Sequence, residues 1–394
     1  MFGLLKYFGR RSPSILFIGF PVVYILKTFQ RVLDIRIAQI PNRLGHTISS
    51  LDFWLTSNQK QKSLGQKEIK KQIFFMDRKY LDDESYRLVA RLVPLGSYWF
   101  WNPVFEAIHW LGWQDNFVFE LVGEPIDEVS GVFKGTKSPL PQANKDVQDR
   151  IAMMCRDFDI EQDKLVLLCI RDSRYGDSIS RGDAERISEY RNSDIFRYSE
   201  AINLLIGSGF FIVRMGNKQK PLYNIDPNKF VSFSRLSDEY SMEQIDLFQS
   251  CAFVISSDTG LNKLAVMCRK PLYMLNVGAF TDRFLHGLTH LVLYKKFKSR
   301  VSGKELTMEE LLTKDILKIT DSEEFVKRDI VIEENSSEEL RLFVSEIIEI
   351  CNSRWVESCE SKRMRERFKR ELEFQGYDFG DFAFPNFFAR DRKW

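Results

Sequence analysis

The second half of the chain alternates short apolar runs with helical patterns, and this alternation constrains the fold more than any other feature. The runs are KLVLLCI (164–170), FFIVRMG (210–216), FVIS (253–256) and PLYMLNV (271–277). Each has the length of a buried strand, and the stretches between them carry helical periodicity. Strands that alternate with helices form a parallel sheet that is covered on both faces. We therefore expect a doubly wound α/β domain in this half.

The first half opens with the same kind of unit. IRIAQI at 35–40 indicates a strand, PNRLGH at 41–46 a turn, and Ile48, Leu51 and Leu55 share one face of the helix predicted next. Strand, glycine-containing turn and helix in this order open a doubly wound domain. A chain of 394 residues, 44% of them hydrophobic, can bury two cores of roughly 150 to 200 residues each.

Composition marks a passage between the two halves. The stretch GEPIDEVSGVFKGTKSPLPQANK at 123–145 is rich in proline, glycine, serine and lysine, as passages between domains are. We expect four parts: an amphipathic, membrane-associated segment at 1–33, a Rossmann-like domain at 34–145, a second Rossmann-like domain at 146–330, and helices with an aromatic tail at 331–394. The tail could dock on either domain or on a partner.

Two segments have the composition of a membrane contact. The apolar run at 15–26 has basic residues on both sides, is too short to span a bilayer and lacks a signal-peptide cleavage site. It fits an in-plane membrane anchor, and it fits equally well an amphipathic helix buried on the domain. The aromatic stretch at 97–113 is consistent with an acceptor cleft, a membrane contact or plain core.

Charge, cysteines and missing motifs exclude several classes of function. The net charge of +2 gives no whole-molecule attraction for nucleic acid, so we expect no nucleic-acid partner. The six cysteines are scattered without a C-x-x-C pair, which is typical of reduced cysteines in the cytoplasm and not of a zinc site. No G-x-G-x-x-G, G-x-x-x-x-G-K-[ST] or G-x-S-x-G motif is present. Nicotinamide, flavin, P-loop and serine-hydrolase chemistry are therefore not expected.

Polar residues follow the predicted strands, at the edge where parallel sheets bind ligands. Loops there lead into helix amino termini, whose N–H groups attract anions. The four segments are Asn42-Arg43-Leu44-Gly45-His46, Arg171-Asp172-Ser173-Arg174-Tyr175, Arg214-Met215-Gly216 and Ser257-Asp258-Thr259-Gly260-Leu261-Asn262-Lys263. Their coincidence predicts a ligand site. The structural alternatives are a plain turn after FVIS, a local ion pair between Arg171 and Asp172, and a Gly260 that only permits a positive φ.

The same segments, together and in this order, resemble the motifs of a known family. The matching residues are Arg43-Leu44-Gly45-His46, Arg171-Asp172-Ser173-Arg174-Tyr175, Val213-Arg214-Met215-Gly216 and Asp258-Thr259-Gly260-Leu261. They are similar to motifs of GT-B-type glycosyltransferases encoded in bacterial surface-polysaccharide gene clusters. The turn from Asp258, its helix and Lys270-Pro271 also resemble the donor-binding turn of the more distant heptosyltransferases, which have histidine at the position of Asn262.

The resemblance implies a GT-B-like fold, in which two Rossmann-like domains face a central cleft, the first for the acceptor and the second for the donor. It implies a metal-independent glycosyltransferase that moves a sugar from a nucleotide-sugar co-substrate, with no further cofactor. The implied acceptor is a cell-envelope polysaccharide, such as lipopolysaccharide, or a lipid-linked glycan. The implied place is cytoplasmic, peripheral to the inner face of the plasma membrane. Asp157-Phe158-Asp159 resembles a D-x-D metal pair, but its charged helical surroundings predict a solvated helix end.

The implied site has donor-binding residues and a general base. As the sugar bond breaks, the leaving nucleotide becomes more negative, so the donor site must supply positive charge and N–H donors. The expected donor-binding residues are Arg43, Gly45, Arg171, Arg174, Tyr175, Arg214, Gly216, Ser257, Asp258, Thr259, Gly260, Leu261, Asn262 and Lys263. For the base, His46 is the first candidate and Asp172 the second. Two other interpretations stay open: a sugar-nucleotide 2-epimerase, and a non-catalytic nucleotide-sugar-binding scaffold of the same fold.

Overall fold

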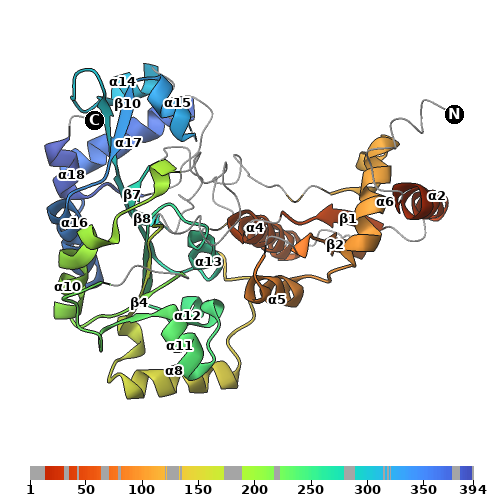
Figure 1. Ribbon diagram of the computed structural model, residues 1–394, viewed down its shortest axis with the longest axis horizontal. Coiled ribbons are helices and arrows are strands. Elements are labelled where there is room, and N and C mark those ends of the chain that lie inside the picture. The colour runs from red at the N-terminus through yellow and green to blue at the C-terminus, as the bar shows by residue number, and fades with distance from the viewer. Residues whose placement is uncertain are drawn as a thin grey trace. The chain divides into compact units, whose positions relative to one another are not determined.

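The chain divides into two compact units, Met1–Pro125 and Ile126–Trp394. The division lies within the passage at 123–145 that composition marks. The computed structural model describes residues 14–30, 35–41, 44–63, 71–78, 81–119, 121, 133, 135–172, 189–216, 222–278, 289–313, 316, 319, 321–374 and 382–392. Each unit has a parallel sheet of its own (Figure 1).

The first unit is built on a small parallel sheet. β1 (Ile35–Gln39) and β2 (Lys71–Phe75) pair along their whole length. Isolated parallel bridges add Leu95 beside Phe74 of β2 and Val118 beside Ile37 of β1. Across the sheet, the segments are thus the third, second, first and fourth along the chain, which is the order found in half of a doubly wound sheet. The predicted α/β character is confirmed here.

Helices pack around this small sheet. α4 (Leu44–Ser63) joins β1 to β2 and buries Ile48 and Leu51, as their spacing predicts. The other elements are the π-helical turn η1 (Ile15–Gly19), α2 (Phe20–Thr28), α5 (Asp83–Leu92), α6 (Tyr98–Trp110) and α7 (Gln114–Phe117). Their shared core consists of Ile15, Val23, Leu26, Ile37, Phe75, Val104, Ala107, Ile108 and Phe117. None of the helices in the described ranges has the length and apolar character needed to cross a bilayer.

Six parallel strands form the sheet of the second unit, in the order β5-β4-β3-β6-β7-β8. The strands are β3 (Leu165–Cys169), β4 (Phe211–Arg214), β5 (Phe230–Ser232), β6 (Phe253–Ser256), β7 (Leu272–Val277) and β8 (Thr289–Tyr294). Numbered along the chain, this is the strand order of a complete Rossmann sheet. Every residue of β3, β4, β6 and β7 is buried, because such a sheet carries helices on both faces. The four predicted strands are confirmed.

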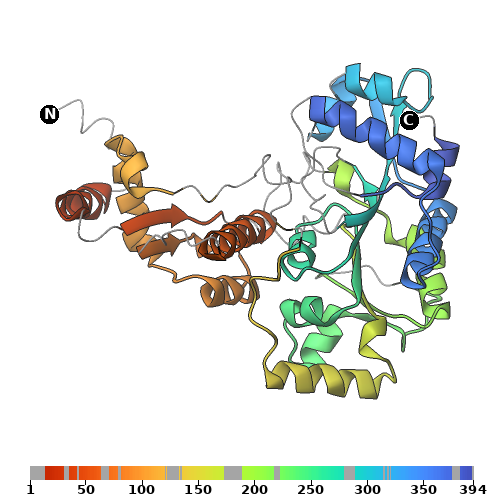
Figure 2. The ribbon, with the colours of Figure 1, turned by 180° about the vertical axis from the view of Figure 1, so that it is seen from behind.

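Helices lie on both faces of this sheet, with α10 (Ser199–Gly207) and α16 (Ser337–Cys351) on one and α12 (Gln244–Ser250) and α13 (Asn262–Met267) on the other (Figures 1 and 2). The remaining helices are α8 (Lys145–Asp157), η3 (Gln162–Lys164), η5 (Glu189–Arg191), η6 (Ile195–Tyr198), α11 (Phe233–Tyr240), α14 (Met308–Thr313), α15 (Ser322–Lys327), α17 (Cys359–Phe374) and α18 (Asn386–Asp391). β9 (Lys296–Ser299) and β10 (Ile330–Glu333) form a separate antiparallel pair.

The carboxyl-terminal aromatic segment docks on the second unit. Ala383 adds a parallel bridge beside Leu291 at the outer edge of β8. Its N–H donates to the His290 carbonyl at 2.9 Å, and its carbonyl accepts from the Val292 N–H at 3.0 Å. Phenylalanine rings around this bridge pack against one another: Phe368, Phe382, Phe384 and Phe388. The tail therefore extends the sheet of the unit that follows the passage.

Candidate functional site

The carboxyl ends of β3 and β6 lie side by side in the middle of the second sheet. The two strands pair up to Cys169, which lies opposite Ser256. From β3 the sheet continues to β4 and β5, and from β6 it continues to β7 and β8. Ligands of open parallel sheets bind at such a switch point, where the chain leaves neighbouring strands in opposite directions. The predicted segments at 171–172 and 257–263 begin here.

Two buried serines join the strand ends at this point. Ser257 N–H donates to the Cys169 carbonyl at 3.0 Å, and Ser257 Oγ accepts from the Arg171 N–H at 2.9 Å. Ser256 Oγ donates to the same Cys169 carbonyl at 3.0 Å. The serines bond the backbone groups that the sheet no longer pairs beyond its last register position. This explains why an apolar strand ends in two hydroxyl side chains.

Asn262 holds the turn that follows β6. Its side-chain Nδ2 donates to the Ser257 carbonyl at 3.0 Å, and its Oδ1 accepts from Ser256 Oγ. Inside the turn, the Thr259 N–H donates to the Ser257 carbonyl at 2.8 Å. Asn262 is fully buried, so its amide serves the backbone of the turn. The predicted donor-binding residues Ser257 and Asn262 therefore shape the turn through polar atoms that bond within it.

Asp258 connects the turn to the end of the neighbouring strand β7. Its Oδ2 accepts from the Gly278 N–H at 2.6 Å, and the residue is fully buried. A side chain at Gly278 has no room, because a Cβ there would lie 2.7 Å from the Tyr190 carbonyl oxygen. The close approach of the backbone at Gly278 thus lets Asp258 orient the turn.

A buried ion pair lies at the end of β4, next to β3. Arg214 Nη2 is 3.4 Å from Asp172 Oδ2, and both side chains are at least nine-tenths buried. Burial lowers the pKa of Arg214 to about 10, while Asp172 acts in the opposite direction. The guanidinium therefore keeps its positive charge at neutral pH. Gly216 follows with φ +106, a backbone conformation that favours glycine.

Arg171 bonds Asn192 and Ser193 in the neighbouring loop, and Lys295 in turn bonds the backbone of that loop. Arg171 Nε donates to Asn192 Oδ1 at 3.0 Å, and its carbonyl accepts from the Ser193 N–H at 2.8 Å. Lys295, directly after β8, donates from Nζ to the carbonyls of Asn192 at 2.5 Å and Tyr190 at 3.0 Å. Burial lowers the pKa of Lys295, and the nearby carboxylates of Glu334 and Asp258 act against this shift.

Lys295 is not among the residues expected from the sequence. The signal that could have found it is the apolar run THLVLY at 289–294, which predicts one more strand, with a lysine immediately after it. Arg171 and Arg214 were predicted as site residues because they are cations at strand ends on the ligand-binding edge, and Lys295 has the same position after β8.

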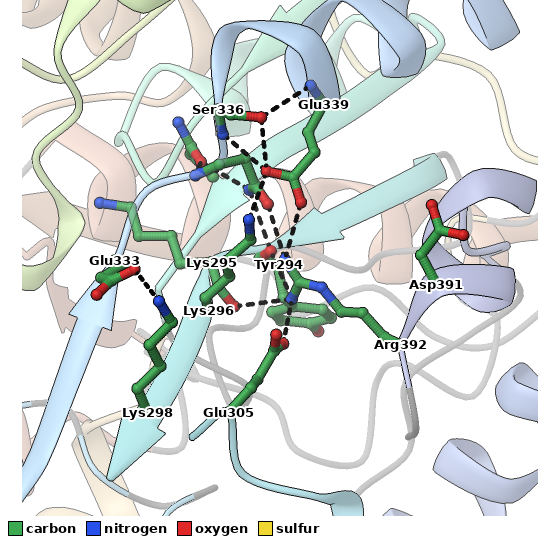
Figure 3. A network of polar contacts seen from close by, with 12 residues as sticks. Tyr294, Lys295, Lys296, Lys298, Glu305, Glu333, Ser336, Glu339, Asp391 and Arg392 are labelled. Atoms are coloured by element: carbon green, nitrogen blue, oxygen red, sulfur yellow. Dashed lines mark hydrogen bonds and ion pairs between the residues drawn. The ribbon is translucent and has the colours of Figure 1, made fainter. Parts of the chain in front are cut away.

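A network of polar side chains connects the ends of β7 and β8 with the carboxyl-terminal segment (Figure 3). Asn276 has a positive φ of 51, and its Oδ1 accepts from the Asn335 N–H at 2.9 Å and from Asn335 Nδ2 at 2.7 Å. Asn335 Oδ1 in turn accepts from Arg392 at 2.9 Å. Arg392 also donates to the Lys295 carbonyl at 3.3 Å and pairs with Glu305 at 3.1 Å. The network links the carboxyl-terminal segment to the strand ends that carry the site.

The remaining predicted residues fall into three groups. Arg43, Arg174 and Tyr175 lie outside the described residues. Gly45 and His46 lie in the first turn of α4 in the first unit, where His46 is exposed. Thr259 and Lys263 are buried, and Gly260 and Leu261 are half-buried, in the turn after β6 and at the start of α13.

The described residues contain no group of three or more histidine, cysteine, aspartate or glutamate side chains that could hold a metal ion. Asp157, the first residue of the D-x-D pattern, ends α8 and accepts a hydrogen bond from the Tyr240 hydroxyl at 2.9 Å. The helix end predicted there is present.

Comparisons with known proteins give remote structural neighbours. No protein-family model matches the chain, and no curated protein matches it. A glycosyl transferase of family 9 from Veillonella parvula is 11% identical, with a TM-score of 0.41, over 78% of this chain and 97% of that one. The heptosyltransferase WaaC of E. coli with ADP is 12% identical, with a TM-score of 0.34, over 75% and 99%. The ADP-heptose heptosyltransferase II of E. coli is 11% identical, with a TM-score of 0.32, over 61% and 84%.

Proposed function

We propose that the chain is a glycosyltransferase that takes its sugar from a nucleotide-sugar donor bound at the switch point between β3 and β6. One observation carries the proposal: the three adjacent strands β4, β3 and β6 each lead to a buried cation. These cations are Arg214, Arg171 and Lys263. Buried positive charge at the ligand-binding edge of a Rossmann sheet fits an anionic ligand better than a neutral one.

The chemistry of sugar transfer needs this charge. When the glycosidic bond to a nucleoside diphosphate breaks, negative charge builds up on the leaving diphosphate, and fixed cations stabilise it in the transition state. Guanidinium groups bind phosphate oxygens with paired N–H donors. Arg171, Arg214 and Lys263 supply the positive charge that a divalent ion supplies in metal-dependent transferases, and we therefore propose a metal-independent reaction without a further cofactor.

His46 is our candidate for the general base that accepts the proton of the acceptor hydroxyl. An imidazole exchanges a proton near neutral pH, and His46 lies exposed at the start of α4. Asp172 is the second candidate, and its ion pair with Arg214 favours a different task, namely orienting that guanidinium. We expect His46→Ala to lose sugar transfer while the protein still binds its donor.

The acceptor that we propose is a cell-envelope polysaccharide or a lipid-linked glycan, modified at the inner face of the plasma membrane. This acceptor class is supported by the motif order, which resembles transferases of surface-polysaccharide clusters. A peripheral position at the membrane would bring the site to a lipid-linked substrate.

Thermal stabilisation by a panel of nucleotide sugars tests the donor site. A donor at one hundred times its dissociation constant adds about 2.7 kcal/mol to the unfolding free energy, which corresponds to a rise of roughly 5 °C in melting temperature. We expect one donor to stabilise the wild type and to lose most of this effect with Arg214→Gln. Arg341→Gln, which removes an exposed arginine of the same unit paired with Glu338, is the control that keeps the effect.

The results of this experiment distinguish a glycosyltransferase from a 2-epimerase and from a non-catalytic scaffold. If no nucleotide sugar stabilises the wild type, the donor site is not where we place it. If a donor binds and the product is its epimer, the protein is a 2-epimerase. Binding without turnover in the presence of a cell-envelope glycan fraction would identify a scaffold.

A further inference from the structure

Two helical segments of the first unit pack tightly into one layer. In Figures 1 and 2, α2 and α6 lie side by side at the amino-terminal end of the unit. A Cβ at Gly19 would lie 2.4 Å from the Pro103 carbonyl oxygen, so the backbones of η1 and α6 are in contact at this glycine. Phe20 and Trp110 meet edge to face with ring centroids 5.2 Å apart. The layer is therefore one structural element with a buried inner face.

The exposed side chains of these two segments are largely apolar. Eight of the fourteen exposed large hydrophobic side chains among the described residues belong to residues 14–30 and 98–110. They are Leu16, Phe17, Tyr24, Ile25, Phe29, Trp99, Phe100 and Trp110. Soluble surfaces carry single apolar side chains at scattered positions, whereas a gathered set marks a place of interaction. We call these eight side chains the aromatic face.

The spacing of the residues in η1 and α2 explains why both faces are apolar. Residues 15, 19, 23 and 26 are buried against the core, whereas residues 17, 21, 24 and 28 are exposed, and each series has helical periodicity. The inner series holds these helices on the unit, and the outer series faces away from that core. Phe17 of the outer series is 80% exposed, and Trp99 at the start of α6 is 84% exposed.

Composition and charge indicate a lipid surface as the occupant. Tryptophan, tyrosine and phenylalanine are the side chains that settle at the boundary between headgroups and acyl chains. Residues 1–33 contain Lys6, Arg10, Arg11, Lys27 and Arg31 but no aspartate or glutamate. The Lys27 ammonium is 5.3 Å from the centroid of the Trp113 ring, and that ring meets Tyr24 of the aromatic face edge to face at 5.6 Å. This segment thus complements an anionic membrane surface.

We propose that the aromatic face docks in the headgroup region of an anionic bilayer, with Phe17 and Trp99 inserted and Lys27 near the lipid phosphates. The inner face stays on the protein, so the helices lie in the plane of the membrane. This inference is independent of the donor site in the other unit, and it names the surface by which the protein would reach a lipid-linked acceptor.

Co-sedimentation of the full chain with lipid vesicles tests the proposal. Vesicles of phosphatidylcholine alone are compared with vesicles of phosphatidylcholine and phosphatidylglycerol in equal parts. We expect the wild type to bind the anionic vesicles, with weaker binding at high salt. The double variant Phe17→Ser/Trp99→Ser should bind them at least about tenfold less, because two inserted aromatic side chains are lost.

A matched control comes from the second unit. Val301→Ser/Val356→Ser removes two apolar side chains that are 83% and 77% exposed, and it should leave vesicle binding unchanged. All four side chains are exposed, so both double variants should melt at the wild-type temperature. Equal binding of the Phe17/Trp99 variant and the wild type would overturn the proposal. The proposal would also be overturned if the wild type did not bind anionic vesicles but formed a dimer, and the Phe17/Trp99 variant did not. The aromatic face would then bind a second copy of the chain. Neither result depends on whether a nucleotide sugar binds.

Discussion

At the scale of single residues, variants of Arg214 and Asp172 show whether this buried ion pair stabilises the fold, binds the donor, or does both. Arg214→Met leaves the Asp172 carboxylate buried without this cation. Breaking one side of a buried ion pair is strongly destabilising, and we expect the unfolding free energy to fall by about 3 kcal/mol. Urea unfolding measures this loss. An unchanged midpoint would mean that water or other groups already stabilise the carboxylate.

The double variant Arg214→Met/Asp172→Asn separates the two roles of the pair. Both charges are then removed, so most of the lost stability should return. Donor binding should stay at least about tenfold weaker than in the wild type, because one charged partner of the diphosphate is missing. Isothermal titration with the donor found in the panel measures the affinity. Wild-type affinity in the double variant would remove Arg214 from the proposed site.

At the scale of elements, two consecutive lysines after β8 offer a matched comparison. Lys295 bonds the carbonyls of Tyr190 and Asn192, and Asn192 bonds Arg171, whereas Lys296 pairs with Glu339 at 2.7 Å in the supporting network (Figure 3). We expect Lys295→Met to weaken donor binding about tenfold, because the loop that holds Arg171 loses its two charged hydrogen bonds. Lys296→Met should cost about 1 kcal/mol of stability and leave donor affinity unchanged. Donor titration and urea unfolding of both variants check this, and equal affinities would contradict a positioning role for Lys295.

The strands of the second sheet could be predicted from the sequence, whereas the contacts of the polar residues that follow them could not. β3, β4, β6 and β7 were predictable, because strands buried on both faces are continuous apolar runs. The tasks of the polar residues after them were not predictable. Ser257 bonds backbone groups of Cys169 and Arg171, more than eighty residues earlier, and only the pairing of β6 with β3 determines this contact. The bridge from Ala383 to β8 likewise depends on long-range packing that no local pattern encodes.

At the scale of the whole molecule, the two units have separate sheets and separate cores, and we expect them to unfold in two calorimetric transitions. Ile108→Ala truncates a fully buried side chain in the core of the first unit and should destabilise that unit by about 3 kcal/mol. Arg392→Gln removes the buried guanidinium that bonds Asn335 and pairs with Glu305 in the second unit, and a similar loss is expected there. Scanning calorimetry should therefore show one lowered transition for each variant, and a different one in each case. If either substitution lowers both transitions together, the two units form a single cooperative structure, and the donor that stabilises the second unit should then protect the first unit equally.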